Sequence, residues 1–219
     1  MHRLRRTVCL RHHAPLKKVL TSPVYRRFGK RIFDFVAALA GLTIVALPMG
    51  AIALAIWVTS GRPILFTQYR VGKDGKLFRI KKFRTMVVRD TPDSNITVTG
   101  DERITPIGRL LRRWKLDELP QLWNVLVGEM SFVGPRPDVP GYADKLQGEA
   151  RRILSLRPGI TGPATLAYRN EEELLAQVDD PIRYNDEVIF PDKVRINLKY
   201  LEECSFTKDL YYIWKTIFP

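Results

Sequence analysis

Histidine is nearly absent from this sequence. All three histidines, His2, His12 and His13, lie in the tail, so no imidazole from residue 14 onward can act as base, nucleophile or zinc ligand. This excludes Ser/His/Asp hydrolysis and most zinc chemistry. The cysteines, Cys9 and Cys204, fit no metal or redox spacing and give no reason to expect an oxidising compartment. The common motifs G-x-x-x-x-G-K-[ST] and G-x-G-x-x-G are also missing, so phosphates must be bound in another way.

Acidic residues are missing from residues 1–31, a segment that contains many Lys and Arg. Such a segment is typical of a disordered or surface-lying arm rather than of a folded unit. The whole chain of 219 residues carries a formal net charge of +13, which calls for an anionic partner: nucleic acid, an acidic lipid surface or a phosphorylated substrate. Its length suits one modest domain plus a membrane element.

Charged residues are absent from residues 35–58, a run long enough to cross a bilayer. Buried helices are rarely so long without a polar face, and the small-residue triplets of a signal cleavage site lie inside this run. Pro48, near its middle, favours a kink. Positive residues flank both ends: Lys30 and Arg31 before the run, and Arg62, Arg70 and Lys73 after it. Since positive charge favours the cytoplasmic side, we expect a re-entrant helix-hairpin, with a straight span as the alternative.

The remainder of the chain has the patterns of short strands and amphipathic helices. Residues 63–71 are rich in strand formers, and the turn signal Asp74-Gly75 precedes 77–83, which predicts a β-hairpin. Thr105-Pro106 is typical of a helix start. The helical pattern at 210–217 includes Trp and Tyr, which suits either a core face or an interfacial helix. The expected fold class is α+β, with a re-entrant membrane helix-hairpin and a small, mostly helical cytoplasmic catalytic domain that contains a β-hairpin.

Two adjacent carboxylates, Asp117 and Glu118, stand at the start of an amphipathic helical pattern that Gly128 is placed to end. In one interpretation Asp117 is a helix N-cap, while Glu118 suits the first turn and Pro120 is tolerated there. In the other, the pair has a chemical role. Adjacent like charges resist joint ionisation unless a cation neutralises one, and Mg²⁺ would do so while the neighbouring carboxylate attacks phosphorus. A helix N-terminus also attracts phosphate groups.

Several cations accompany the pair. Arg112 lies five residues before Asp117, and Arg136 stands between two prolines that restrict its backbone and suit bidentate capture of phosphate. An ordinary surface arginine in a turn is the alternative for Arg136. Lys82 and Arg84, at the end of the second predicted strand, are either phosphate ligands or part of a solvated edge that discourages strand pairing.

A series of motifs occurs along most of the chain. From the N-terminus they are Lys30-Arg31 with Asp34, the proline-broken apolar helix, Gln68-x-Arg70-x-Gly72-x-x-Gly75, Lys82-Phe83-Arg84-Thr85-Met86, Leu116-Asp117-Glu118-Leu119-Pro120-Gln121-Leu122-Trp123-Asn124-Val125, Gly128-Glu129-Met130-Ser131, Gly134-Pro135-Arg136-Pro137 and Arg157-Pro158-Gly159-Ile160-Thr161-Gly162. In number, order and spacing, this series resembles the monotopic phosphoglycosyl transferases, or bacterial sugar transferases. Leu47-Pro48 departs from the Ser-Pro pair that breaks the helix in some members.

This resemblance implies a two-step reaction at the cytoplasmic face of a bacterial inner membrane. The Asp117 carboxylate would attack the sugar-linked phosphate of a UDP-sugar and release UMP, and polyprenyl phosphate would then attack the aspartyl phosphosugar. A sequential mechanism with Asp117 as a base rather than a nucleophile is the alternative within the enzyme class. Glu118 is implied to bind Mg²⁺, which acts as a phosphate clamp and neutralises charge. Five cations are implied to hold phosphates or the nucleotide: Arg112, Arg136, Lys82, Arg84 and Arg157.

The chain is thus expected to divide into a basic arm (1–29), a re-entrant membrane helix (30–60) and a cytosolic-face catalytic domain with interfacial helices (61–219). The expected partners are a UDP-sugar, polyprenyl (undecaprenyl) phosphate and membrane lipids. Nucleic-acid binding is not expected, because it would leave the apolar run unexplained. A non-catalytic, membrane-tethered basic docking module is the alternative, although it leaves the acid pair without a role. The motifs do not identify the sugar or the glycan pathway, and the oligomeric state, a homodimer included, is left open.

Overall fold

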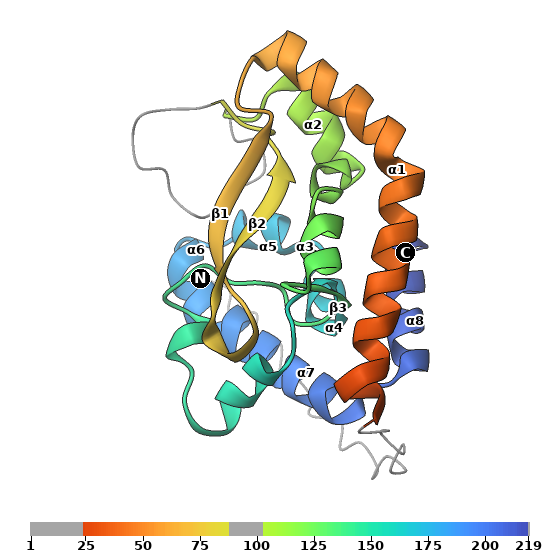
Figure 1. Ribbon diagram of the computed structural model, residues 1–219. Helices are drawn as coiled ribbons and strands as arrows, with labels where there is room; N and C mark the ends of the chain where they lie inside the picture. The colour runs from red at the N-terminus through yellow and green to blue at the C-terminus, as the bar shows by residue number, and fades with distance from the viewer. Residues whose placement is uncertain (1–23, 88–102, 219) are drawn as a thin grey trace.

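A computed structural model describes residues 24–87 and 103–218; most of the basic arm therefore lies outside the described residues. The described chain mixes helices and strands, as expected. Figure 1 shows a long helix, α1, beside a body of short helices and two small sheets. In chain order the elements are α1 Lys30–Ser60, β1 Leu65–Val71, β2 Leu77–Phe83, α2 Pro106–Arg113, α3 Gln121–Val127, β3 Ser131–Val133, β4 Gly159–Thr161, α4 Pro163–Ala167, α5 Glu171–Leu175, α6 Pro181–Tyr184, α7 Phe190–Glu203 and α8 Phe206–Ile217.

Helix α1 is long and apolar enough to cross a membrane and follows a π-helical turn, Tyr25–Gly29. It continues through Pro48 as one helix, where the sequence predicts a break, and Figure 1 shows that its axis bends so that its last turns lie above α2 and the β-hairpin. Its apolar side chains are left uncovered by the body: Leu47 is 84% exposed and Ile44 is 76% exposed. Such a surface is unfavourable in water and favourable in lipid, so α1 is suited to be embedded in a membrane.

The first turns of α1 are attached to the body by polar contacts. The buried Lys30 ammonium lies 2.5 Å from the Asp209 carboxylate of α8. The Asp34 carboxylate accepts hydrogen bonds from the Ser131 hydroxyl and from the Phe132 backbone N–H, each at 3.1 Å. The Arg31 guanidinium donates to the last carbonyl groups of α3, both at 2.7 Å, where a positive charge complements the helix dipole. These contacts fix the start of an apolar helix on a charged body.

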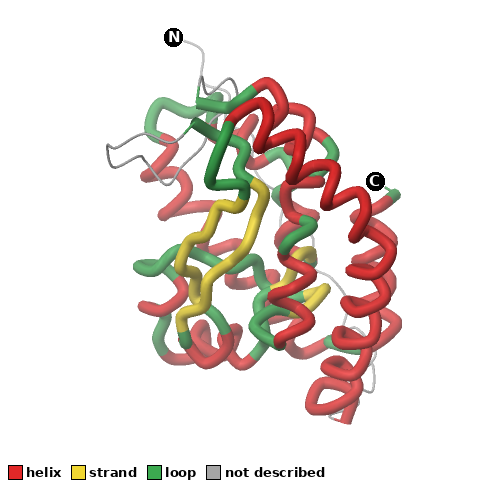
Figure 2. Tube along the Cα trace, turned by 45° about the horizontal axis from the view of Figure 1, so that its top comes forward, coloured by secondary structure: helices red, strands yellow, loops and turns green. Residues whose placement is uncertain are grey.

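The predicted β-hairpin is confirmed. β1 and β2 pair antiparallel, in a register that runs from Leu65 opposite Phe83 to Val71 opposite Leu77. The turn adopts positive φ at Asp74 (58°) and Gly75 (80°), the conformation for which Asp-Gly is favoured. Figures 1 and 2 show α3 between this hairpin and α1. The core there joins Phe78 and Ile80 of β2, Val125 of α3, Ala38 of α1, and Met130.

A single buried amide, Asn124, fixes α3 to the edge of β2. Its Nδ2 atom donates to the Arg79 carbonyl at 2.8 Å, and its Oδ1 atom accepts from the Lys81 backbone N–H at 3.1 Å. Nδ2 also donates to the Glu129 carboxylate at 2.6 Å. The side chain is fully buried, so these bonds satisfy groups that water cannot reach. The orientation of α3 relative to the hairpin therefore depends on Asn124.

A second small sheet joins two of the glycine-containing motifs. β3 and β4 pair in parallel, with Ser131 opposite Gly159 and Val133 opposite Thr161. A Cβ atom at Gly159 would lie 2.1 Å from the Gly134 backbone nitrogen, so a side chain there would force the two segments apart. This close approach explains why glycine occurs at both positions, and it holds the loop at 134–137 in place.

The expected helix start at Thr105 is also confirmed, because its hydroxyl accepts from the Gly108 backbone N–H at 3.0 Å and Pro106 is the first helical residue. The C-terminal pattern forms α8, one face of which packs on the core as one of the two interpretations predicts. Ile213 packs against the core, whereas Trp214 is 58% exposed. Other exposed apolar side chains lie on α2, α3 and α8: Leu110, Trp123, Val127, Leu210, Tyr211 and Ile217.

We predict that Asn124→Leu destabilises the protein by about 3 kcal/mol, because it leaves buried backbone groups of β2 without partners. For a chain of this size the Tm should fall by roughly 6–12 °C. Thermal unfolding of the full chain in lipid nanodiscs would measure the shift. Asn170→Leu is the matched control, since Asn170 is exposed and its side chain makes no capping hydrogen bond to α5. Equal shifts in the two variants would contradict the role of Asn124.

Candidate active site

The acid pair lies in a 3-10 turn, Leu116–Glu118, that precedes α3. Lys115, just before the turn, adopts a left-handed conformation with φ of 54°, which is unfavourable for a residue with a side chain by about 1 kcal/mol or more. α3 itself begins only after Pro120, and no side chain caps either the turn or α3. The interpretation in which Asp117 is the N-cap of this helix is therefore not supported, and capping does not explain the pair.

Glu118 is held by two cations from distant segments. Lys82 of β2 donates to its Oε1 atom at 2.8 Å, and Arg136 approaches the same oxygen at 3.2 Å. Burial alone would raise the pKa of Glu118, but Arg136 and Lys82 outweigh burial and bring the pKa to about 2. Glu118 is therefore ionised across the physiological range. The neutralising cation that the sequence argument required is supplied here by Lys82 and Arg136.

Asp117 has a different environment. The residue is 7% exposed, and its buried Oδ1 atom has no hydrogen-bond partner. Burial raises its pKa, as does the adjacent Glu118 charge, whereas Lys82, Arg112 and Lys115 lower it. A partly desolvated carboxylate with an unsatisfied oxygen, surrounded by cations, is suited to act as a nucleophile toward an anionic substrate. The two neighbours thus differ: two cations bind Glu118 Oε1, whereas Asp117 Oδ1 has no hydrogen-bond partner.

Arg112, in the last turn of α2, is brought to the pair as the sequence predicts. Its Nε atom donates to the Thr85 hydroxyl at 2.9 Å, which orients the guanidinium near Asp117. Lys82, Arg112 and Arg136 therefore gather around the acid pair from β2, α2 and the loop at 134–137. This arrangement offers several positive groups to phosphate oxygens.

Two predicted phosphate ligands have other partners. The buried Arg84 guanidinium donates to the carbonyl oxygens of Ser60, Gly61 and Arg62 at 2.5, 2.9 and 3.2 Å, so it closes the C-terminal end of α1. Arg157 donates from Nε to the Gly128 carbonyl at 2.8 Å, at the end of α3 opposite the acid pair. The contacts of both arginines serve to position helices, and neither brings a guanidinium to Asp117.

The donor set around the pair is compatible with a shared metal ion but does not form a complete metal site. Within residues 24–87 and 103–218, no group of three or more His, Cys, Asp or Glu is placed to hold a metal. Mg²⁺ typically uses one or two carboxylates together with water and substrate phosphates. The unsatisfied Asp117 Oδ1 atom and the neighbouring Glu118 carboxylate provide such oxygens. The residues therefore fit Mg²⁺ that arrives with a phosphate-bearing substrate.

Three charged residues near the site were not among the predicted site residues. Lys115 contributes to the field at Asp117, and Arg70 and Asp138 lie near Arg136. Arg70 belongs to a quoted motif, and Asp138 directly follows the Pro-Arg-Pro segment. In the sequence, only the position of Asp138 next to the Pro-Arg-Pro motif could have indicated that it lies near the site. The order of residues along the chain does not reveal which charges tertiary folding brings together.

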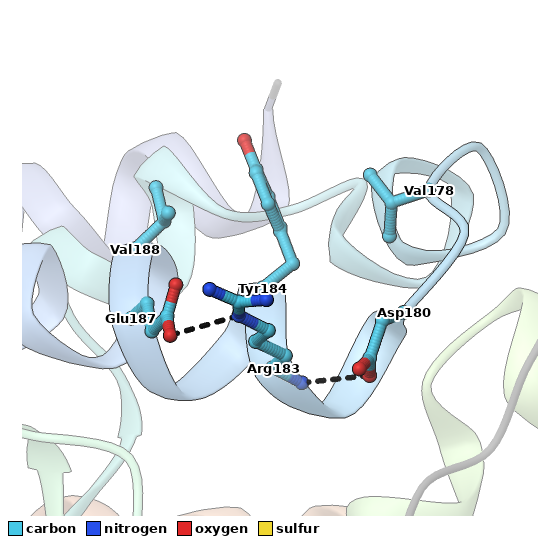
Figure 3. Close-up of a pocket in the computed structure, with 6 residues that line it drawn as sticks. All are labelled: Val178, Asp180, Arg183, Tyr184, Glu187 and Val188. Carbon is cyan, nitrogen blue, oxygen red and sulfur yellow. Dashed lines mark hydrogen bonds and ion pairs between the residues drawn. The ribbon is translucent and has the colours of Figure 1, made fainter.

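A separate pocket lies at α6 and the turn that follows it, and Figure 3 shows its lining. Arg183 binds Glu187 at 2.9 Å, and its backbone N–H donates to Asp180 at 3.0 Å. Arg183, Glu187 and Asp180 therefore have partners within the lining of the pocket itself. The lining includes none of the residues around the acid pair: Val178, Asp180, Arg183, Tyr184, Glu187 and Val188.

Comparison with known proteins agrees with the motif pattern. Residues 25–219 match the sequence profile of the family described as bacterial sugar transferase. A UDP-glucose:undecaprenyl-phosphate glucose-1-phosphate transferase of Klebsiella pneumoniae is 36% identical over 86% of this chain and 39% of its own length. A protein of Caulobacter vibrioides with the same name is 37% identical over 95% of this chain and 73% of its own length.

A further relative is named for a different sugar. The UDP-N-acetylgalactosamine-undecaprenyl-phosphate N-acetylgalactosaminephosphotransferase of Aeromonas hydrophila is 34% identical over 94% of this chain and 46% of its own length. The chain thus spans about two-fifths of the length of several curated relatives. Similar overall identity to proteins named for glucose and for N-acetylgalactosamine does not indicate which sugar this chain would use.

We predict that Asp138→Asn stabilises the protein at pH 7.5. Burial raises the Asp138 pKa to about 6, an effect that Glu171 strengthens and that Lys193, Arg70 and Arg136 only partly offset. A raised carboxyl pKa means that the wild type is most stable below the unfolded pKa of about 3.8 and loses that stability as the pH rises through 6. The loss is on the order of 2–3 kcal/mol.

The difference in Tm between the variant and the wild type should therefore be positive at pH 7.5 and shrink toward zero at pH 4.5. Asp179→Asn removes an exposed carboxylate and is the control, with no such pH dependence expected. A variant that is less stable than the wild type at pH 7.5 would contradict the direction of the shift.

Proposed function

The chain belongs to the bacterial sugar transferase family, and from this membership we propose that it transfers a sugar-1-phosphate from a UDP-sugar to undecaprenyl phosphate. The products are undecaprenyl-diphosphate-sugar and UMP, and the reaction would be the first membrane step of a bacterial glycan pathway. The observation that carries the proposal is the Asp117 carboxylate, which is buried, has an unsatisfied oxygen and lies beside Glu118, whose Oε1 atom binds Lys82 and Arg136. The cations around the pair suit the phosphates of both substrates.

In the first step Asp117 acts as the nucleophile. Its carboxylate oxygen forms a bond to the sugar-linked phosphorus, the phosphoanhydride bond breaks, and UMP leaves with the bonding electrons. An aspartyl phosphosugar results. Lys82 and Arg112 favour the ionised form of Asp117 that this attack requires, and they attract the negatively charged donor to the site.

In the second step a phosphate oxygen of undecaprenyl phosphate attacks the phosphorus of the aspartyl phosphosugar. The bond to the Asp117 oxygen breaks, and the carboxylate is regenerated. Arg112, which the Thr85 hydroxyl orients, and Arg136, in the loop between two prolines, would bind phosphate oxygens in either step. The same positive groups serve both half-reactions, because both substrates bring phosphate to the same carboxylate.

Glu118, together with substrate phosphate, would hold the Mg²⁺ ion. When bound, Mg²⁺ supplies charge neutralisation and a clamp on phosphate oxygens. Lys82 and Arg136 keep Glu118 ionised and therefore able to bind a cation, since its pKa is about 2. Their contacts occupy Oε1, so the second carboxylate oxygen of Glu118 is the natural ligand.

Helix α1 would enter and leave the membrane on the cytoplasmic side, as a re-entrant element. Both of its ends are attached to the same charged body, which supports this topology. Lys30 pairs with Asp209 near the start of α1, and Arg84 binds the carbonyl groups at its end. A helix that crossed the bilayer fully would place those two ends about 30 Å apart across the hydrocarbon core. Re-entry also keeps Asp117 on the same face as soluble UDP-sugars.

We predict that Asp117→Asn abolishes turnover and covalent labelling. The purified full chain in nanodiscs, with Mg²⁺ and undecaprenyl phosphate, should convert at least one radiolabelled UDP-sugar from a broad panel into labelled lipid and UMP. The Asn variant should be slower by roughly 10³-fold or more, and should retain no donor-derived label without lipid acceptor. Asp179→Asn is the control. Robust turnover by Asp117→Asn would exclude the nucleophile role, and no labelled lipid from any donor would contradict the transferase proposal.

A second prediction concerns topology. In a Cys9→Ser, Cys204→Ala background, single cysteines at Arg27 and at Lys76 should react with a membrane-impermeant maleimide from the same side of sealed vesicles. A cysteine at Leu47, in the bend, should stay unlabelled because lipid covers it. Lys199→Cys, on α7, reports the side on which the body lies. Labelling of the Arg27 and Lys76 positions from opposite sides would rule out re-entry.

A further inference from the structure

A polar group that the proposed reaction does not use lies beyond Arg136. It consists of Asp138, Arg70 and Lys193, which come from the loop after β3, from β1 and from α7. The end of β1 fixes its position: the Val71 backbone N–H donates to the Asp138 carbonyl at 2.9 Å, and Arg70 donates from NH1 to the Pro137 carbonyl at 3.2 Å. Val71 packs in the same core cluster as Val194, so α7 carries Lys193 to this end of the hairpin.

The group has unused hydrogen-bonding capacity. The Asp138 side chain is half-buried, yet its carboxylate forms no hydrogen bond or ion pair with any residue in the described ranges 24–87 and 103–218. The Nε atom of Arg70 is buried and unpartnered, although NH2 of the same guanidinium donates to Gln68 at 2.6 Å. Buried polar groups are normally satisfied, so an unpartnered acceptor beside an unpartnered donor indicates a place for a ligand.

Lys193 is held at the border of this group. Its ammonium binds both oxygens of Glu171 on α5, at 2.7 and 2.6 Å. The pair is largely shielded from solvent, and Lys193 also lies over the Tyr168 ring. Glu171 and Tyr168 therefore hold Lys193 where its positive charge acts on the Asp138 carboxylate.

The carboxylate of Asp138 argues for hydroxyls rather than phosphate at this end of the site. A carboxylate repels phosphate oxygens but accepts hydrogen bonds from hydroxyl groups, and these bonds are strong because the acceptor is ionised. Phosphate is better placed among Lys82, Arg112 and Arg136, around Asp117. A UDP-sugar carries phosphate on one side of its hexose and hydroxyl groups on the others. With the phosphate at Asp117, the hexose can extend past Arg136 toward Asp138.

We propose that Asp138, assisted by Arg70 and Lys193, forms the subsite that recognises the hexose hydroxyl groups of the UDP-sugar, and that these residues help to set sugar specificity. This inference rests on the proposed transferase function. It also accounts for a residue that opposes folding, since a half-buried carboxylate without a partner destabilises the protein in exchange for a functional role.

The test compares the wild type with Asp138→Asn, which keeps the shape of the side chain and removes its charge. For each, kcat/KM is measured in nanodiscs with undecaprenyl phosphate and two pairs of C4 epimers: UDP-glucose with UDP-galactose, and UDP-N-acetylglucosamine with UDP-N-acetylgalactosamine. Inhibition by UMP, which lacks the hexose, is measured in parallel. We expect the ratio of kcat/KM within the preferred pair to change by about tenfold or more, the effect of one hydrogen bond to a charged group. The inhibition constant of UMP should stay within about twofold.

Arg70→Lys is the second variant, in case Asp138→Asn does not fold, and should shift the same ratio. Asp179→Asn should shift neither quantity. An unchanged ratio of kcat/KM between the epimers would overturn the inference. An equal loss of kcat/KM for all donors, together with weaker inhibition by UMP, would also overturn it and would assign the group to nucleotide binding. These outcomes leave the transferase function intact. Absence of turnover by the wild type with every donor would instead contradict the proposed function, and with it this subsite.

Discussion

The contact of Glu118 with Lys82 and Arg136 is the interaction on which the site depends. A carboxylate that is 12% exposed is unfavourable unless cations compensate for its lost hydration. The two cations come from β2 and from the loop after β3, while Glu118 belongs to the turn before α3. The same contact therefore joins three segments and leaves the adjacent Asp117 as the carboxylate with an unsatisfied oxygen.

The surrounding fold brings these segments together by specific, mostly polar contacts. Asn124 holds α3 on the edge of β2, and the close approach of Gly134 and Gly159 fixes the loop that carries Arg136. Helix α1 is attached at its start by Lys30 and at its end by Arg84. The apolar side chains along the middle of α1 remain exposed. The helix can therefore bind the body through its polar ends while its middle contacts lipid.

Several residues around the acid pair are in energetically unfavourable states, whereas residues elsewhere in the fold are in favourable ones. Lys115 is in a left-handed conformation, Asp117 has a buried oxygen without a partner, and burial raises the pKa of Asp138. Each of these features is unfavourable, and all lie within one part of the molecule. Away from it, the hairpin turn, the Thr105 cap and the buried Asn124 are each in the conformation or hydrogen-bonding state that their residue type favours. Such a contrast is typical of functional sites.

The features that follow from neighbouring residues could be read from the sequence. The Asp74-Gly75 turn, the Thr105-Pro106 helix start, the left-handed Gly128 that ends α3 and the long apolar run all depend on local sterics, capping or composition. Proximity in the sequence also indicated Arg112 as a neighbour of Asp117. For Lys82 and Arg136 the motif pattern, rather than local physics, indicated a shared site.

Which distant segments and side chains contact each other was decided by tertiary packing alone. The pairing of β3 with β4 joins two three-residue strands, too short to show a period, and nothing local indicates that Asn124 bonds to β2. Asp117 does not cap α3, which was one of the two interpretations of the sequence, because the segment forms a turn at Leu116–Glu118 and a helix that begins only at Gln121. Arg84 and Arg157 bind carbonyl groups of α1 and of the α3 terminus, which sequence spacing cannot distinguish from phosphate. Local conformation depends on residues a few positions apart, whereas the partner of a charge depends on which segments the folded chain brings within hydrogen-bonding distance.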